Sequence, residues 1–399
     1  MGAETGDVVD VRKIAGVRRM TGSSAIGVLH VVDALYIGGA EHVAINLVNL
    51  LPRDRFAPYL CSTRAEGPLS SFVAPHVTRL CLERRGRLDP TALRQFCDFV
   101  ADREIRIVHA HASALFFARL ASALSRRCSL IWHDHYGRSD FGDRPAWLYR
   151  LATRGVAGVI AVNQTLAAWC SNYLHFPKER VWYIPNLVPS EPPTEGDEYL
   201  VLPGEPGKRL VCVANFRPQK DHPNLLRAMS LAAAQVPGAH LFLVGDSADP
   251  SYVATIRAQI SELRLDDAVT YMGPRNDVPA ILRNCDIGVL GSASEGLPLA
   301  LLEYGRAGLA AVATSVGQCP EVLDHGYAGL LVPPGSPEDL GRALVRLLHH
   351  REERAQYASR FQNRVDELYH PKRIMRRVCD VYETVLRTSH GVRRRGRAA

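Results

Sequence analysis

Short apolar runs alternate along the chain with longer segments of helical spacing. Ile26 to Val32 is rich in β-branched residues, the glycine pair Gly38-Gly39 follows, and Ala40 to Leu51 repeats its apolar positions at intervals of three and four. The same alternation continues through both halves of the chain. Strands that alternate with helices predict an α/β fold whose parallel sheets are covered by helices on both faces.

A stretch rich in Pro, Glu and Gly separates two groups of these elements and predicts a linker over 189–208. The remaining strands are predicted at Ile105–His109, Leu130–His133, Gly158–Val162, Arg209–Ala214, His240–Val244, Val269–Met272, Ile287–Leu290 and Ala310–Ala313. We therefore expect two tandem, Rossmann-like, doubly wound domains. Ligands of such sheets bind at the carboxyl ends of the strands, so the site is expected in a cleft between the domains.

The expected domain boundaries follow from where the periodicity starts and stops. We predict a mobile leader over 1–24, an N-terminal domain over 25–188, the linker, and a C-terminal domain over 209–370. A helix over 371–388 is expected to return to the N-terminal domain, and 389–399 is expected to be a basic tail.

Composition narrows the class of protein. The chain has 399 residues with 47% hydrophobic residues and a net charge of +7, which excludes disordered and collagen-like classes. Nine scattered cysteines without a C-x-x-C pair indicate reduced thiols, and with no secretory signal or transmembrane-length run they predict a cytoplasmic protein. The arginine-rich C-terminus predicts a solvated tail, with contact to an anionic membrane face as the alternative. Because no aromatic residues interleave with these arginines, we expect no nucleic acid partner.

The strongest local motif runs from Asp286 to Gly308. A buried strand ends in a small-residue loop, and Gly296-Leu297-Pro298 then opens a helix whose free N–H groups suit a diphosphate. Glu295 in the loop and Glu303 in the helix can accept hydrogen bonds from hydroxyl groups of a sugar and a ribose. The alternative is an ordinary helix with one acidic residue near its start and one solvated glutamate on its face, and the motif alone does not choose between the two interpretations.

Two further motifs are weaker. One carries positive charge, and the other has a flexible backbone. Arg217 and Lys220 follow a predicted strand, where two cations can neutralise a leaving diphosphate without a metal ion. A surface turn with two solvated cations is the alternative. Gly38 and Gly39 permit close approach of a ligand before a helix, but they do not form the G-x-G-x-x-G pattern of a dinucleotide site.

Two histidine pairs stand at the ends of predicted strands. Residues i and i+2 of a strand share a face, so His109 with His111, and His133 with His135, each offer two metal ligands. This pattern motivates a metal-dependent hydrolase as an alternative function. A polar cleft wall with satisfied histidines explains the same residues without a metal, and no further ligand cluster has characteristic spacing.

Taken together, these segments resemble the GT-B superfamily of nucleotide-sugar glycosyltransferases, in its retaining group with a Glu-x7-Glu signature (group 1, family 4 type). The resemblance covers nearly the whole expected folded region, and its parts occur in the family's order: IGGAEHVAINL, IVHAHAS, IWHDHYG, VIAVNQT, YIPNLV, ANFRPQKDHPNLL, LFLVGD, VTYMGPRNDVPAIL, EGLPLALLEYGRAG and PEVLDHGYAGLLVPPG.

The resemblance implies roles for individual residues. Glu295, Lys220, Arg217 and His133 would act at the reaction centre, with His133 lining it and the two cations holding the diphosphate. The implied donor-binding residues are Gly38, Gly39, Asn215, Arg217, Lys220, Arg275, Glu295, Gly296, Leu297, Leu299 and Glu303. One position departs from the family, because Ala214-Asn215 stands where many relatives have Gly-Arg. Arg217 would have to replace the missing arginine.

The implied reaction is transfer of a sugar from a nucleoside diphosphate, with UDP the expected nucleotide, to an acceptor hydroxyl with retention of anomeric configuration. The resemblance implies no cofactor and no metal. It implies a glycan or lipid-linked acceptor of bacterial surface polysaccharide or glycolipid synthesis, at the inner face of the cytoplasmic membrane. The alternatives are the metal-dependent hydrolase, a non-catalytic sugar-nucleotide-binding protein and an epimerase of the same fold.

Overall fold

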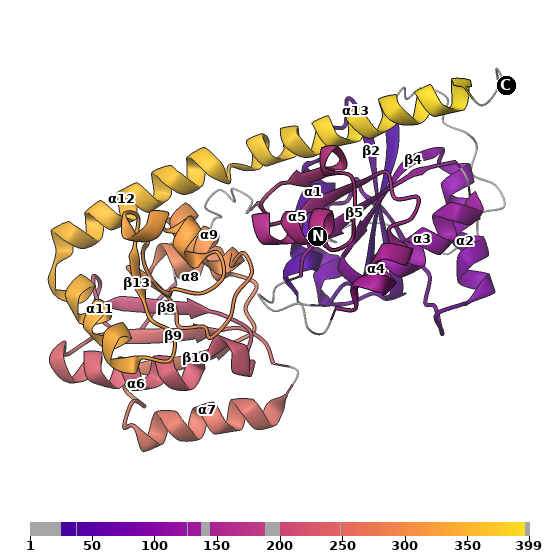
Figure 1. The fold of residues 1–399 in the computed structure, drawn as a ribbon. Coiled ribbons are helices and arrows are strands. Elements are labelled where there is room, and N and C mark those ends of the chain that lie inside the picture. Colours follow the sequence, from indigo (N-terminus) through magenta and orange to yellow (C-terminus); the bar gives the residue numbers. More distant parts are fainter. Residues whose placement is uncertain are drawn as a thin grey trace. The chain divides into compact units, whose positions relative to one another are not determined.

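The chain forms two compact units in the computed structural model, which describes residues 25–36, 38–125, 127–136, 144–187, 200–247 and 249–395 (Figure 1). Unit 1 contains the chain to Tyr136, the segment that ends at Asn186, and the C-terminal segment from Pro371. Unit 2 contains Leu187–His370. The predicted leader and the start of the predicted linker lie outside the described residues.

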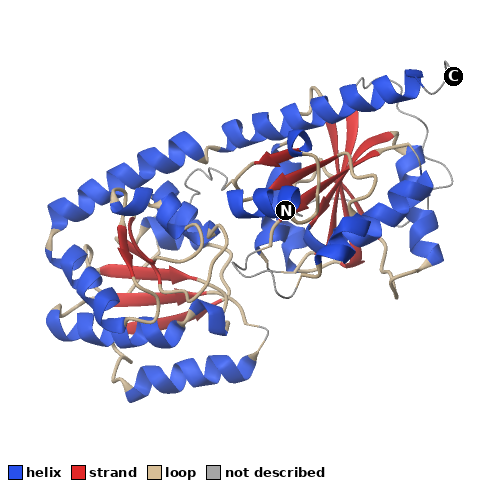
Figure 2. Ribbon diagram, viewed as in Figure 1, coloured by secondary structure: helices blue, strands red, loops and turns tan. Residues whose placement is uncertain are grey.

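Unit 1 is built on a seven-stranded parallel sheet in the order β3-β2-β1-β4-β5-β6-β7. The strands are β1 (Ile26–Ala34), β2 (Phe56–Ala65), β3 (Thr78–Cys81), β4 (Ile105–His111), β5 (Ser129–Asp134), β6 (Gly158–Ala161) and β7 (Val181–Tyr183). Helices flank the sheet (Figure 2), as burial of both faces of a parallel sheet requires. They are α1 (Gly39–Leu50), α2 (Pro90–Asp102), α3 (Leu115–Ser125), α4 (Ala146–Ala152), α5 (Gln164–Asn172) and α13 (Pro371–Arg395).

The two faces of this sheet differ in chemistry. One face carries Leu29, Val108 and Trp132, which pack into an apolar core with residues of α2 and α3. The alternate residues of the same strands are His30, His109 and His133, and all three are buried. Tyr382 of α13 packs against this second face. The period of two along a strand therefore places a row of imidazoles inside unit 1.

Unit 2 repeats the design with six parallel strands in the order β10-β9-β8-β11-β12-β13. The strands are β8 (Arg209–Val213), β9 (His240–Val244), β10 (Val269–Gly273), β11 (Ile287–Leu290), β12 (Ala310–Thr314) and β13 (Leu330–Val332). The helices are α6 (His222–Gln235), α7 (Pro250–Glu262), α8 (Val278–Arg283), α9 (Leu299–Ala307), α10 (Cys319–Val322), α11 (Pro337–His349) and α12 (Arg351–Leu368). Both faces of the sheet are apolar, with one core under α6 and α11 and another under α9 and α12.

Each sheet has one point where the strand order reverses. In unit 1 the reversal lies between β1 and β4, and in unit 2 it lies between β8 and β11. The crevice outside the carboxyl ends of such a strand pair is the usual ligand site of this fold. The predicted α/β fold with two doubly wound sheets is confirmed.

The C-terminal helix differs from its prediction. The predicted helix ends at residue 388, whereas α13 continues to Arg395, so most of the predicted basic tail is helical. A sequence of arginines propagates a helix readily once the preceding turns are packed. Among the described residues, no helix combines the length and the apolar character needed to cross a bilayer.

Gly288 on β11 shows how tightly unit 2 is packed. A Cβ atom added there would lie 2.2 Å from Cδ2 of Tyr304, a fully buried side chain of α9. The Tyr304 hydroxyl accepts a hydrogen bond from the Val213 amide at 2.8 Å, so the ring has little freedom to move.

Gly288→Ala should therefore destabilise the protein by about 1 to 3 kcal/mol, the usual cost of overpacking a core. Gly86→Ala is the matched control, because a Cβ atom there meets nothing within 4 Å. Chemical denaturation of both variants measures the difference. Equal unfolding midpoints for the two variants would contradict the packing argument.

Candidate functional site

Lys220 and Glu295 meet at the switch point of unit 2. Lys220 follows β8, Glu295 follows the neighbouring strand β11, and the Lys220 Nζ donates a hydrogen bond to Glu295 Oε1 at 2.6 Å. The Ser292 hydroxyl donates to the same oxygen, also at 2.6 Å. The Glu295 side chain is only 7% exposed, whereas that of Lys220 is 25% exposed. The structure thus joins two residues that the sequence placed in separate motifs.

Backbone contacts fix the loop that carries Glu295. The Ala293 amide donates to the Gln219 carbonyl at 2.8 Å, and the Gln318 amide donates to the Gly296 carbonyl at 3.0 Å. Gly317 has a φ of +53°, and a Cβ atom there would lie 2.0 Å from the Glu295 carbonyl oxygen. A side chain at this position is therefore excluded by both strain and contact. The loop is held from two sides, which orients the Glu295 carboxylate.

The helix after this loop begins one residue later than predicted. Pro298 is the N-cap of α9 and Leu299 is its first residue. No side chain caps this N-terminus, so its first amides keep their hydrogen-bonding capacity. Gly296 and Leu297 lie just before the helix, and Glu303 is half-buried within it. The predicted diphosphate position thus follows Glu295 closely along the chain, and Glu295 binds Lys220 from the loop after β8.

Arg217 and Asn215 also follow β8 but make different contacts. Arg217 is exposed, and its guanidinium forms no ion pair within the described part of the chain. Asn215 is half-buried, and its Oδ1 accepts a hydrogen bond from the Asp246 amide at 3.4 Å, which links the ends of β8 and β9. Asn215 is thus engaged in the backbone of the unit, and Arg217 is the available cation.

Arg275 lies apart from Lys220 and Glu295 in the sheet of unit 2. It follows β10, the edge strand, which β9 separates from β8. Its guanidinium binds both oxygens of Asp277, at 2.7 and 2.5 Å, in an exposed pair. The structure therefore shows a local partner for Arg275 and no contact with Lys220 or Glu295.

The glycine pair belongs to unit 1 and opens α1. Gly38 is the N-cap of α1 with an extended backbone, and Gly39 is the first helical residue. The Gly38 carbonyl accepts hydrogen bonds from the His42 amide at 3.1 Å and from its ring at 3.0 Å. This helix N-terminus follows β1, so it lies at the carboxyl side of a switch-point strand, as the sequence predicts for a ligand-binding turn.

Five histidines and one tyrosine form a buried polar cluster in unit 1, which we call the histidine cluster. Its members come from β1, β4, β5 and the residue after β5, with the tyrosine from α13. The hydrogen-bonded pairs are Tyr382–His109 at 2.6 Å, Tyr382–His30 at 3.2 Å, His109–His133 at 3.2 Å, His30–His111 at 3.0 Å and His111–His135 at 3.0 Å. The sequence predicted the two histidine pairs but missed His30 and Tyr382. A polar residue inside the first apolar run was the available signal for His30.

Burial keeps these imidazoles uncharged. It lowers the pKa of His30 and of His135 to about 3, and it holds the pKa values of His109, His111 and His133 well below the usual value. Two sets of three, His30 with His109 and His111, and His111 with His133 and His135, place ligand atoms within 4.8 Å of one another. Neutral imidazoles are the form that binds a transition metal, but here they already bind each other.

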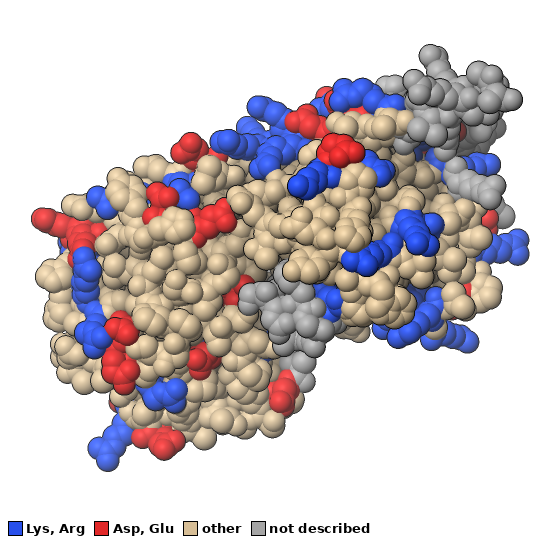
Figure 3. All heavy atoms as spheres, viewed as in Figure 1, with Lys and Arg blue, Asp and Glu red and all other residues tan. Residues whose placement is uncertain are grey.

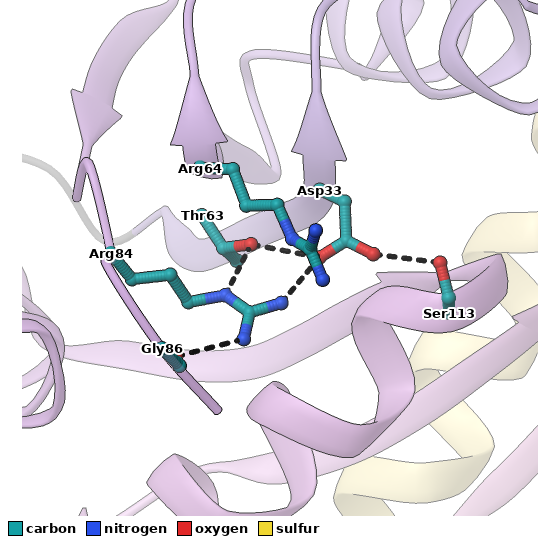
Figure 4. A network of polar contacts seen from close by, with 6 residues as sticks. All are labelled: Asp33, Thr63, Arg64, Arg84, Gly86 and Ser113. Carbon is teal, nitrogen blue, oxygen red and sulfur yellow. Dashed lines mark hydrogen bonds and ion pairs between the residues drawn. The ribbon is translucent and has the colours of Figure 1, made fainter. Parts of the chain in front are cut away.

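Another network, which the sequence did not indicate, surrounds Asp33 at the end of β1 (Figure 4). The Asp33 carboxylate accepts hydrogen bonds from Thr63 at 2.8 Å, from Arg84 at 2.9 Å and from Ser113 at 2.7 Å. These hydrogen bonds help to hold the pKa of Asp33 below its usual value, although burial opposes them. Arg64 lies 3.9 Å from the same carboxylate and remains largely exposed. The network ties together the ends of four strands of unit 1, β1 to β4, and leaves one arginine facing solvent.

Arg144 forms a second unpredicted contact, a buried ion pair with Asp134 at 2.9 Å. Its guanidinium lies 4.3 Å from the ring centres of Tyr149 and Trp169, and farther over Trp132 and Tyr136. Burial raises the pKa of Asp134, and the adjacent Arg144 opposes that shift. The cation and its aromatic surroundings anchor the chain after the segment 137–143, which lies outside the described residues.

Acid should destabilise unit 1 through the histidine cluster. In the unfolded chain these histidines take up protons near pH 6.5, whereas folded His30 and His135 do so only near pH 3. Stability is therefore fully present above pH 6.5 and falls as the pH falls toward 3, by about 1.4 kcal/mol per pH unit for each such histidine.

Urea unfolding from pH 7.5 to 4.5, followed by near-ultraviolet circular dichroism, measures this slope. His30→Gln should reduce this slope by the contribution of about one proton. The substitution His349→Gln at an exposed position should leave the slope unchanged. A midpoint that stays constant between pH 7 and 5 would show that the cluster is not buried in neutral form.

Comparisons with known proteins give concordant results. The family model "Glycosyltransferase Family 4" matches residues 37–191, and the model "Glycosyl transferases group 1" matches residues 202–364. The structure resembles that of HepE from Anabaena solved with UDP and glucose, with a TM-score of 0.75 at 21% identity over 90% of this chain and all of that one.

Two curated relatives align with different shares of the chain. N-acetyl-alpha-D-glucosaminyl L-malate synthase of Bacillus anthracis is 30% identical over 46% of this chain, and the aligned region spans only 47% of that relative. UDP-Gal:alpha-D-GlcNAc-diphosphoundecaprenol alpha-1,3-galactosyltransferase of Escherichia coli is 24% identical over 81% of this chain and 88% of its own length. The two matched families follow each other along the two units, and the chain belongs to the GT-B glycosyltransferases of group 1.

Proposed function

We propose that the protein transfers a sugar from a nucleoside diphosphate sugar to an acceptor hydroxyl, with retention of anomeric configuration and without a metal ion. The observation that carries the proposal is the convergence of Lys220, Glu295 and the uncapped N-terminus of α9 at the switch point of unit 2. A cation, a buried carboxylate and free helical amides together match the charge and hydroxyl pattern of such a donor.

The main requirement of the reaction is to stabilise the negative charge that develops on the leaving diphosphate. Lys220 is partly exposed, so its ammonium can reach a phosphate while it keeps its hydrogen bond to Glu295. The amides at the start of α9 add hydrogen-bond donors and the positive end of the helix dipole. Arg217, which is exposed after β8, supplies the second cation in place of Asn215. Fixed donors of this kind stabilise charge as it develops, because they need little reorganisation.

The carboxylates of Glu295 and Glu303 bind the hydroxyl groups of the donor sugar and of the ribose. Glu295 is held by Ser292 and Lys220 through one oxygen, Oε1, which leaves Oε2 to accept hydrogen bonds from hydroxyl groups of the donor sugar. Glu303, one turn into α9, is placed to bind the ribose. In unit 1, His133 lines the reaction centre, and Gly38 and Gly39 approach the donor diphosphate or the acceptor.

The acceptor is a glycan or a lipid-linked glycan of bacterial surface polysaccharide or glycolipid synthesis. The name of the Escherichia coli relative specifies a diphosphoundecaprenol acceptor. Exposed basic residues gather on α13 (Figure 3), including Lys372, Arg373, Arg376 and Arg387. They suit a peripheral contact with an anionic membrane surface. All nine cysteines are free thiols, which supports a location in the reducing cytoplasm at that surface.

A metal-dependent hydrolase is the weaker candidate. It would need ligand nitrogens from the histidine cluster, and all of the nitrogens of His30, His109 and His111 are engaged in hydrogen bonds within the cluster. Within the cluster only Nε2 of His133 and Nδ1 of His135 have no partner, so any third ligand nitrogen would have to give up a hydrogen bond.

The first experiment is a thermal-shift screen against UDP, GDP, ADP, CMP and their sugar conjugates, with and without EDTA. A nucleotide at 100 times its dissociation constant should add about 2.7 kcal/mol of stability. We expect a shift with UDP and its conjugates that EDTA does not change. Loss of stability on chelation, without a shift by any nucleotide, would favour the metal-dependent alternative.

Lys220→Ala should reduce turnover at saturating donor by about 100-fold or more, the usual effect of removing one charge-stabilising donor. Lys208→Ala is the matched control, because Lys208 forms a lysine–glutamate pair of the same unit, with Glu205 at 2.7 Å. Steady-state kinetics and melting temperatures of both variants separate catalysis from folding. An unchanged turnover in Lys220→Ala would remove this lysine from the mechanism.

A further inference from the structure

The histidine cluster is a single unbranched chain of hydrogen bonds. In order, its members are His135, His111, His30, Tyr382, His109 and His133. Each inner histidine uses both ring nitrogens, and the tyrosine hydroxyl contacts a ring on either side. Two buried nitrogens at the ends have no partner, Nδ1 of His135 and Nε2 of His133.

Proton counting allows only two fully bonded states of this chain. A neutral imidazole carries one N–H, and a hydroxyl carries one O–H, so each inner member must donate to one neighbour and accept from the other. The direction of one hydrogen bond therefore fixes the direction of all five. Following the contacts, one state has every histidine protonated at Nε2, and the other has every histidine protonated at Nδ1.

The two states present opposite groups at the ends. In the first state, His133 offers an Nε2–H donor and His135 offers an Nδ1 lone pair. In the second state, His133 offers an Nε2 lone pair and His135 offers an Nδ1–H donor. Because Tyr382 joins the two halves of the chain, its hydroxyl links the tautomer of His133 to that of His135.

We propose that the histidine cluster is a two-state relay that sets whether His133 donates or accepts a hydrogen bond, with Tyr382 of α13 as its central positioning residue. The importance of His133 for transfer rests on the proposed function. The relay itself rests on the six side chains and their contacts.

Conversion between the states conserves protons. One proton enters at His135 Nδ1, each of the five hydrogen-bonded protons crosses to its acceptor, and one proton leaves from His133 Nε2. The cluster gains no charge, which fits its burial. Burial also raises the pKa of Tyr382 well above its usual value, so the hydroxyl keeps its proton.

A ligand at His133 would select one state for all five rings. A sugar oxygen that accepts a hydrogen bond from His133 Nε2 favours the first state, and His135 must then present its lone pair. The group that His135 presents would thus depend on the ligand at His133 through the interior of unit 1, without movement of the backbone.

The test is two-bond ¹H–¹⁵N correlation spectroscopy of the full chain labelled with ¹⁵N-histidine, which distinguishes the two tautomers of each ring. We expect the same fraction of Nε2–H form in all five rings of the free protein. In Tyr382→Phe, the fractions in His109 and His133 should depart from those in His30, His111 and His135. Unequal fractions in the wild-type protein, or unchanged fractions in the variant, would overturn the relay.

Internal controls separate a local effect from misfolding. The Tyr382 ring packs on Phe56 with a centroid distance of 5.6 Å, and phenylalanine keeps that contact. His240, bonded to Thr270 at 2.8 Å in unit 2, should show the same tautomer in both proteins. Zinc binding would also overturn the relay. The decisive result would be Zn²⁺ that stays bound stoichiometrically after desalting and makes the Nε2–H fractions of the five rings unequal.

The outcome does not depend on the transfer reaction. Absence of nucleotide binding in the thermal-shift screen would refute the proposed function and leave equal fractions in the free protein unaffected. Conversely, if the protein is an active transferase but the Nε2–H fractions of its five rings are unequal, the relay alone would be refuted. Addition of UDP-glucose, if it binds, should shift His133 and His135 together in the wild-type protein, and His133 with His109 but without His135 in Tyr382→Phe.

Discussion

Parallel pairing of strands is the constraint on which both candidate sites depend. When all strands of a sheet run in one direction, their carboxyl ends share one edge, and the loops that follow them meet there. Lys220 and Glu295 are 75 residues apart and still form a 2.6 Å hydrogen bond, because β8 and β11 are neighbours in the sheet. In unit 1 the same constraint aligns His109 with His30, since β4 pairs with β1. Local sequence supplies the side chains, and the strand order brings them together.

The sequence predicted the helices and strands well where the hydrophobic periodicity agrees with the glycine and proline residues that mark their ends. β9 and β11 have the predicted bounds, and α9 begins within one residue of its predicted start because Pro298 marks the helix entrance. β2 escaped prediction, since its apolar positions do not alternate cleanly and Pro58 interrupts them. The return of α13 to unit 1 fills the space over the imidazole row with Tyr382. No local pattern within a helix reveals which distant sheet it will cover.

The candidate sites were predictable to different depths. Lys220 and Glu295 follow strands in separate motifs, and their position after strands was enough to assign them to one edge. Arg275 also follows a strand, but β10 lies at the edge of the sheet, which sequence position cannot show. The engagement of Asn215 with Asp246 and the complete set of partners around Asp33 likewise depend on side-chain geometry that spacing does not encode. The role of each site residue in transfer is still a prediction.

The surroundings of Arg144 have an optical consequence. Trp132 and Trp169 flank its guanidinium, and the remaining tryptophans of the sequence, Trp147 and Trp182, also belong to unit 1. Unit 2 contains tyrosines but no tryptophan, so indole emission excited at long wavelength originates entirely in unit 1. The two halves of this chain are therefore spectroscopically distinct without any label, and the melting of one can be followed while the other is observed only by circular dichroism.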